Sequence, residues 1–308
     1  WKLREETKGK DVIFQYGTQQ RSMRQFQQAV DLVRNGYIGK ITRVDVWCSG
    51  MDGQMNAKGL SKPLGSTEPT PVPECLDYDL WLGPSPMAPH TADRTTNYVL
   101  WHNYDYALGF IAGWGAHPLD AAQWGLDSDH TSPVRYEGKG EMAPAGGLFN
   151  TTRYWDVQCA YANGVPMRFM DEKTAMPVIA AYHCAKRDHG TVFHGEEGWV
   201  GVDRMALYSH EANKLRKIEF KSEDKRVTAS TGQQRNFIDS VKSRQPAINP
   251  LESAIRSDTI SHLSDIAIRT GRAVEWDPQK EALIKGTPEQ QALLHRTPRE
   301  EWNFFLKS

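Results

Sequence analysis

Ile41-Thr-Arg-Val-Asp-Val-Trp-Cys48 alternates in character along its length, with Val44, Val46 and Cys48 on one side of an extended chain. A two-residue period is typical of a strand that is buried on one face. We therefore expect a sheet to begin at this stretch. Further stretches of strand composition lie at 151–162, 167–170, 178–182, 191–194, 199–202, 204–208 and 215–220.

Turn residues separate these later stretches. Asn163-Gly164, Gly195 and Gly198 fall between them, and such residues allow the tight connections of hairpins. Strands that are joined by hairpins pair antiparallel. The sequence therefore predicts a mainly antiparallel sheet.

Two helices have clear ends in the sequence. Ser22 is a candidate N-cap with Gln25 three residues later, and Gly36 stands where the first helix should end. Asn249 is a candidate N-cap for a second helix, which should end at Gly271. Together with the strands, these helices predict an α+β fold with a large open sheet covered by helices on one face.

The first residues do not fit this sheet. Residues 1–9 resemble the end of a helix, and the following Asp11-Val-Ile-Phe-Gln-Tyr16 resembles a short strand. One helix and one strand cannot bury their apolar faces without neighbours. We expect them to be the last elements of another domain.

Composition narrows the possible partners. The 308 residues include 37 Lys and Arg against 38 Asp and Glu, without a long run of like charges. Neither a nucleic acid nor a membrane surface is the expected partner, and no apolar stretch is long enough to span a bilayer. Four separated cysteines and a chain that starts at Trp1 leave the compartment undetermined. A small molecule is the expected partner.

Residues 101–125 contain most of the candidate functional side chains. They follow a long loop over 50–100, rich in proline and glycine, which we expect to cover a pocket. Residues 101–125 combine aromatic side chains, glycines, and His117 one helical turn before Asp120. Aromatic faces stack on sugar rings, while Asp, His and Asn bond hydroxyls, so a polyol ligand is indicated. The competing interpretations are that Trp114 and Trp124 belong to the core and that His117 is structural.

Seven short motifs follow one another along the chain. They are Gly17-Thr-Gln-Gln-Arg-Ser22, Gly36-Tyr-Ile-Gly-Lys40, Asp79-Leu-Trp-Leu-Gly-Pro84, Gly113-Trp-Gly-Ala-His-Pro-Leu-Asp120, Phe237-Ile-Asp-Ser-Val-Lys-Ser-Arg244, His262-Leu-Ser-Asp-Ile-Ala-Ile268 and Trp276-Asp-Pro278. In this order they resemble the motifs of the Gfo/Idh/MocA oxidoreductases, a family that includes glucose-fructose oxidoreductase and inositol dehydrogenase. The resemblance covers nearly the whole chain.

This resemblance implies a two-domain protein that uses NAD or NADP. Residues 1–20 would then be the last helix and strand of a Rossmann domain, a remnant αβ unit, and residues 21–308 a C-terminal substrate-binding and oligomerisation domain. The sequence has no glycine-rich phosphate turn after a strand. We expect it to be the C-terminal part of a longer protein; the alternative is a naturally split or degenerate member.

The resemblance also implies a role for His117 as the acid/base that acts on the substrate hydroxyl, with Asp120 beside it. Many members carry Asp four residues before this histidine, but Gly113 occupies that position here. Asp105, Asp120 and His102 are alternative sources of a carboxylate or a second base, and the sequence does not choose between them.

The remaining site residues are expected from their position near these motifs. Five residues are predicted to bind the substrate: Trp101, His102, Tyr104, Asp105 and Trp114. Gln20 and Arg21 are predicted to contact the cofactor, although Arg21 could instead pair with an acidic residue. No metal site is predicted, since His183, Cys184, His189 and His194 fit no compact ligand spacing.

The expected function is therefore an NAD(P)-dependent oxidoreductase that acts on a hydroxyl of a sugar, glycoside or cyclitol. Two alternatives remain: an NAD-dependent glycoside hydrolase or lyase that oxidises its substrate transiently, and a non-catalytic carbohydrate-binding subunit. The sheet is expected to present an apolar second face, which would be buried in a homodimer or homotetramer.

Overall fold

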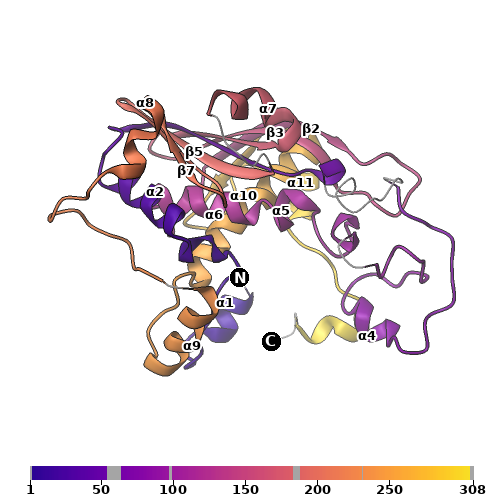
Figure 1. Ribbon diagram of the computed structural model, residues 1–308. Coiled ribbons are helices and arrows are strands. Elements are labelled where there is room, and N and C mark those ends of the chain that lie inside the picture. Colours follow the sequence, from indigo (N-terminus) through magenta and orange to yellow (C-terminus); the bar gives the residue numbers. More distant parts are fainter. Residues whose placement is uncertain (1, 54–63, 97–98, 183–187, 231, 306–308) are drawn as a thin grey trace.

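One nine-stranded sheet organises the chain in a computed structural model that describes residues 2–53, 64–96, 99–182, 188–230 and 232–305 (Figure 1). Its strands are β1 (Ile41–Cys48), β2 (Arg135–Met142), β3 (Thr152–Ala160), β4 (Pro166–Asp171), β5 (His189–Gly195), β6 (Gly198–Val202), β7 (Leu207–Ser209), β8 (Val274–Asp277) and β9 (Ala282–Leu283). They lie in the order β7-β6-β5-β1-β4-β3-β2-β8-β9. The β1–β4 pair is parallel and the other pairs of described strands are antiparallel. The predicted α+β class and mainly antiparallel open sheet are confirmed.

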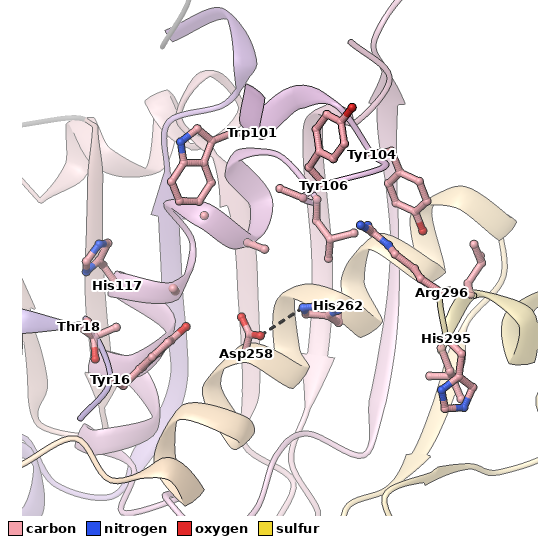
Figure 2. Close-up of a pocket in the computed structure, with 18 residues that line it drawn as sticks. Tyr16, Thr18, Trp101, Tyr104, Tyr106, His117, Asp258, His262, His295 and Arg296 are labelled. Atoms are coloured by element: carbon pink, nitrogen blue, oxygen red, sulfur yellow. Dashed lines mark ion pairs between the residues drawn. The ribbon is translucent and has the colours of Figure 1, made fainter. Parts of the chain in front are cut away.

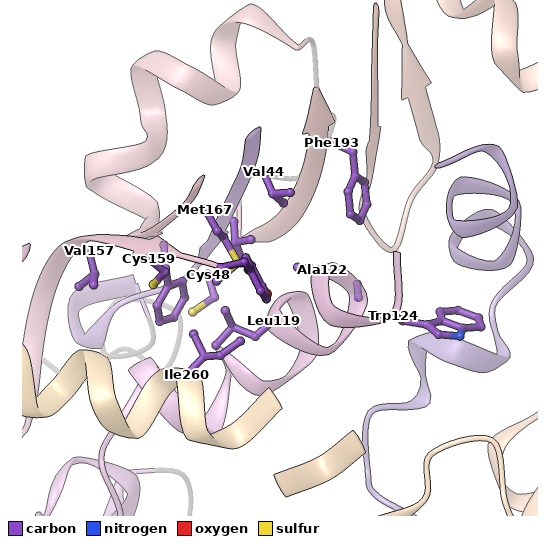
Figure 3. Close-up of a cluster of buried hydrophobic side chains, with 14 of the residues drawn as sticks. Val44, Cys48, Leu119, Ala122, Trp124, Val157, Cys159, Met167, Phe193 and Ile260 are labelled. Carbon is purple, nitrogen blue, oxygen red and sulfur yellow. Dashed lines mark hydrogen bonds between the residues drawn. The ribbon is translucent and has the colours of Figure 1, made fainter. Parts of the chain in front are cut away.

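A layer of helices covers one face of this sheet (Figure 1). Its main members are α2 (Arg24–Arg34), α6 (Ala116–Gly125) and α10 (Leu251–Thr270). The main hydrophobic core lies between helices and sheet, where Leu119 and Ile260 meet Val44 and Phe193 (Figure 3). Burial of these side chains is the principal favourable term that holds the two layers together. None of the helices in the described ranges is both long and apolar enough to cross a bilayer.

Shorter helical elements connect and flank these layers. They are α1 (Lys2–Thr7), η1 (Gln19–Ser22), α4 (Tyr78–Leu82), η2 (Leu100–His102), α5 (Phe110–Gly113), α7 (Glu172–Ala181), α8 (His210–Asn213), η3 (Lys214–Lys217), α9 (Gln233–Ser243), α11 (Pro288–Leu293) and η4 (Glu300–Phe305).

The two predicted helices form, but the residues predicted to cap them, Ser22 and Asn249, bond to other parts of the chain. Helix α2 begins after Met23, and the Ser22 hydroxyl bonds that of Ser230 at 2.8 Å. Helix α10 begins after Pro250, and the Asn249 amide donates to the Thr18 carbonyl at 2.9 Å. Both residues join the segment before α2 to later parts of the chain, because their side chains reach polar partners there.

The strand that was predicted over 11–16 is absent. Its backbone bonds Asn249, Gln233 and Arg244 instead, because no described strand lies beside it. The strand predicted over 178–182 is also wrong, since that segment belongs to α7 and the turn after it. Asp171 caps this helix by accepting from Lys173 N at 2.9 Å, and this local signal outweighs the β-branched residues.

Two further differences concern which segments form strands. Residues 215–220 were predicted to be a strand, but they begin in η3 and continue without regular structure. Strand β2 was not predicted, because its glycines and charges break the apolar alternation. A Cβ on Gly140 would lie 2.6 Å from Tyr154 O and 2.8 Å from Ile268 of α10. Glycine at this position therefore allows α10 to pack closely on the sheet.

The second face of the sheet differs from the expectation of an apolar surface. Part of it is covered by α7, where Ile179 packs with Trp47 and Met170. The adjoining open part carries an Asp156–Arg168 ion pair at 2.8 Å. Alternation along β3 explains this polarity, because it directs the polar residues of the strand away from the main core.

Candidate functional site

A pocket of about 610 Å³ lies against α5, α6 and α10 (Figure 2). Residues 16–18 close one end, and the segment that follows α11 closes the other. Its polar and aromatic lining comprises Tyr16, Thr18, Trp101, Tyr104, Tyr106, His117, Asp258, His262, His295 and Arg296. The sequence predicted Trp101, Tyr104 and His117 as site residues, and the structure brings these three together at one cavity.

His117 lies in the first turn of α6 and lines this pocket. Its Nδ1 is buried without a hydrogen-bond partner among the described residues, which leaves Nε2 as the nitrogen open to the cavity. Burial, followed by the charges of Arg204 and His189, lowers the pKa of His117 to about 3. The imidazole is therefore neutral near pH 7.

Trp101 explains the glycine that precedes this histidine by four residues. A Cβ on Gly113 would lie 2.3 Å from the Trp101 ring, so no larger side chain fits without movement of the indole. Trp101 is 38% exposed and lines the pocket beside α5. An aromatic surface thus stands where the common form of the family has a carboxylate, and it can stack on the apolar face of a sugar ring.

Asp258 and His262 form a second polar group in the pocket, on adjacent turns of α10. Their ion pair measures 3.2 Å (Figure 2). Burial lowers the pKa of His262, but its hydrogen bond to Asp258 and the charge of that carboxylate outweigh burial and raise it. Burial, followed by the charges of Asp258 and Asp120, raises the pKa of Tyr16. Sequence reasoning did not assign Asp258 or His262 to the site, although their spacing of four places both on one helical face.

Asp120 lies outside the pocket lining, in a buried network with Arg21. The Arg21 guanidinium donates from Nε to Asp120 Oδ2 at 2.8 Å and from Nη2 to Asp120 Oδ1 at 2.6 Å. The other side of the guanidinium pairs with Asp129 at 2.7 Å. Thr18 and Ser257 hydroxyls also donate to the Asp120 carboxylate. With side chains 2% and 1% exposed, Arg21 and Asp120 are enclosed and mutually satisfied.

The other predicted residues lie around the pocket without lining it. Gln20 bonds the His189 ring at 2.8 Å, and Trp114 donates from Nε1 to Asp188 O at 3.0 Å. His102 is fully buried against Phe149, and burial lowers its pKa to about 4. Gln20, Trp114 and His102 thus contact neighbouring residues of the fold and not the pocket.

Asp105 lies near the site but lines a neighbouring pocket of about 540 Å³, not the cavity that contains His117. The two pockets share Tyr104, Tyr106 and Arg296. Asp105 is therefore separated from His117 by this shared wall.

The histidines that were considered for a metal have other partners. His194 Nε2 lies 3.0 Å from Asp45 Oδ2, and His189 bonds Gln20. His183 and Cys184 lie outside the described residues. Within the described ranges, no group of three or more His, Cys, Asp or Glu is arranged to hold a metal ion.

An open mixed sheet with one main helical layer, and a histidine-bearing pocket on the helical side, defines an α+β domain. The model of the C-terminal alpha/beta domain of an oxidoreductase family matches residues 23–304, which is most of the chain. The chain therefore belongs to the Gfo/Idh/MocA oxidoreductase family. No curated protein matches the sequence.

Solved structures agree with this fold. An oxidoreductase of Thermotoga maritima, provisionally named, superposes with a TM-score of 0.54 at 13% identity over 92% of this chain and 66% of its own. An NAD-binding protein from Listeria innocua gives a TM-score of 0.51 at 13% identity over 89% of this chain and 70% of its own. This chain thus spans about two thirds of the length of these similar structures.

The low pKa of His117 predicts a pH-dependent stability. The unfolded imidazole takes up a proton as the pH falls through its ordinary pKa of 6.5, while the folded one stays neutral until about pH 3. The contribution of His117 to the free energy of unfolding is therefore complete above pH 6.5 and decreases as the pH falls. Between pH 7 and pH 5 this contribution decreases by about 2 kcal/mol. Urea denaturation at both pH values should show a smaller decline for His117→Gln.

Exposed His130 provides the control, since His130→Gln should keep the decline of the wild type. An equal decline in the wild type and in His117→Gln would contradict the neutral, buried state of His117.

Proposed function

We propose that the complete protein is an NAD(P)-dependent oxidoreductase that acts on a hydroxyl group of a sugar, glycoside or cyclitol. Family membership supports the reaction class. The observation that carries the substrate class is the neutral imidazole of His117, which opens on a pocket whose wall includes the indole of Trp101. An aromatic face beside a proton acceptor suits a ring that has an apolar face and a reactive hydroxyl.

The described residues fit only the reacting end of a nicotinamide cofactor. Ala112 and Ala116 are small side chains of the same pocket lining as His117, and they leave room for a planar ring. The described residues offer no corresponding binding site for the phosphates of the cofactor. Arg21 was predicted to contact the cofactor, but its guanidinium is enclosed between the carboxylates of Asp120 and Asp129. We therefore assign the phosphate contacts to a domain outside this chain, as the similarity to an NAD-binding protein supports.

When bound, the nicotinamide supplies the acceptor for the hydride that leaves the substrate carbon. His117 has the complementary task in this proposal: its Nε2 accepts the proton of the same hydroxyl as the carbonyl forms. A neutral imidazole is required for this transfer, and burial keeps His117 neutral. Asp258 and His262, on the α10 side of the pocket, orient the other hydroxyls through hydrogen bonds.

His117→Ala is expected to lower kcat of the complete protein by at least about a hundredfold, because the hydroxyl proton loses its acceptor. The measurement is NADH or NADPH formation at 340 nm with a panel of hexoses, methyl glycosides and inositols, together with thermal unfolding. An unchanged kcat in a folded variant would remove His117 from the mechanism. His130→Ala, at an exposed position, is the matched control and should retain activity.

We further propose that the complete protein is a homodimer or homotetramer that associates through the second face of the sheet. A hollow of about 550 Å³ on this face is lined by Arg43, Asp45, Gln158 and Arg168, which can form reciprocal hydrogen bonds and ion pairs across a twofold axis.

Light scattering at micromolar concentration should therefore give a dimer or tetramer for the wild type. Arg168→Glu should shift the population toward the monomer, because it replaces the cation beside Asp156 with an anion and gives this face of each subunit an excess of negative charge that repels the other subunit. Arg235→Glu on the exposed side of α9, away from this face, is the control. A monodisperse monomer of the wild type would contradict the proposal.

A further inference from the structure

The pocket of about 540 Å³ adjoins the cavity of His117 and extends it; we call it the outer pocket, and the cavity of His117 the inner pocket. Tyr104, Tyr106 and Arg296 belong to both linings and so form their shared wall. The outer pocket is completed by residues 84–86, Asp105, Thr297 and Pro298. The two pockets thus meet at these three residues, and a ligand of two rings can contact both.

The shared wall is held in place by contacts that do not use the cavity. Arg94 Nη1 donates to the Tyr106 hydroxyl at 2.7 Å, and Trp81 packs edge-on against the Tyr106 ring. The guanidinium groups of Arg269 and Arg296 lie 3.7 and 4.5 Å from the Tyr104 ring. Such stacked, bonded groups lose little freedom when a ligand binds.

The outer wall is fixed by Arg299, which lies three residues after Arg296. Its Nε and Nη2 donate to Gly83 O at 3.0 and 2.8 Å, and its Nη1 pairs with Asp79 at 2.7 Å. The segment after α11 is thereby tied to the end of α4, beside which it lies in Figure 1. These bonds hold the two sides of the outer pocket at a defined separation.

The polar groups of the outer pocket match the hydroxyls of a neutral sugar. Arg296 forms no ion pair with any described residue and can donate to hydroxyl or ring oxygens. Asp105 is the one carboxylate in the outer lining and can accept hydrogen bonds from hydroxyls. Its negative charge offsets that of Arg296, which disfavours an anionic ligand, while Pro84, Pro86 and Pro298 supply apolar surface.

We infer that the substrate has two rings: the ring that is oxidised occupies the inner pocket, and a neutral second sugar or a comparable aglycone, joined to it by a glycosidic bond, occupies the outer pocket. This inference rests on the function proposed above. Binding energy from the second ring, remote from the reacting carbon, then favours two-ring substrates over free monosaccharides.

The test compares glucose, methyl glucoside, cellobiose and maltose, and the corresponding galactose and mannose compounds, with the complete protein. For the preferred sugar, kcat/KM of a two-ring compound should exceed that of the monosaccharide by about tenfold or more. Ser85→Trp, at a half-buried position that lines the outer pocket alone, should abolish this difference and leave monosaccharide turnover unchanged. Asp105→Asn should reduce the difference without filling the pocket.

Ser222→Trp, in the exposed segment that follows η3, is the matched control and should behave as the wild type. Equal kcat/KM for one-ring and two-ring compounds, unaffected by Ser85→Trp, would overturn the inference and leave the proposed function intact. A preference for cellobiouronic acid over cellobiose that Arg296→Gln abolishes would overturn the assignment of a neutral second ring. Failure to oxidise any compound would instead overturn the proposed function, on which this inference depends.

Discussion

The buried ion pair between Arg21 and Asp120 is the constraint on which the site depends. It joins the segment before α2 to α6, and Ser257 adds α10 to the same network. Two charges removed from water are stable only when both are fully bonded, and here Thr18 and Asp129 complete the bonding. Loss of Arg21 would leave the Asp120 carboxylate buried without a cation, so the network fixes how these elements meet.

The pocket is built on that arrangement. Tyr16 comes from the segment that the network holds, His117 is three residues before Asp120 on α6, and Asp258 follows Ser257 on α10. These three pocket residues therefore lie within three positions of a member of the network. The acidic group that was expected close to His117 acts mainly as a support for the backbone, while the face that reaches the cavity carries the imidazole.

Absence of a carboxylate at position 113 changes the character of the site. Trp101 fills the space over Gly113, so the inner pocket offers an aromatic surface and a neutral histidine, with the nearest polar pair on α10. Recognition then depends on stacking and on the hydrogen bonds of Asp258 and His262. The shared wall at Tyr104 extends this surface toward the outer pocket.

Sequence patterns correctly predicted the strands, helices and turns whose formation depends on local periodicity and turn residues. The alternation of β1, the helix that ends at Gly36 and the hairpin at Asn163-Gly164 all form as expected. Patterns failed where distant partners decide the outcome. Residues 11–16 lack a neighbouring strand, and β2 forms because its glycines admit α10. The residues of α10 that complete the site could not be placed by sequence, because only the fold brings Asp258 toward His117.

Asp120→Asn in the complete protein tests this account most directly, because it keeps the shape of the side chain and removes the charge opposite Arg21. We expect the free energy of unfolding to fall by about 2 kcal/mol, because Arg21 then keeps only Asp129 as an anionic partner, while kcat of the folded protein stays within about tenfold of the wild type. Unchanged stability with a kcat as low as that of a His117 variant would contradict it and make Asp120 part of the chemistry.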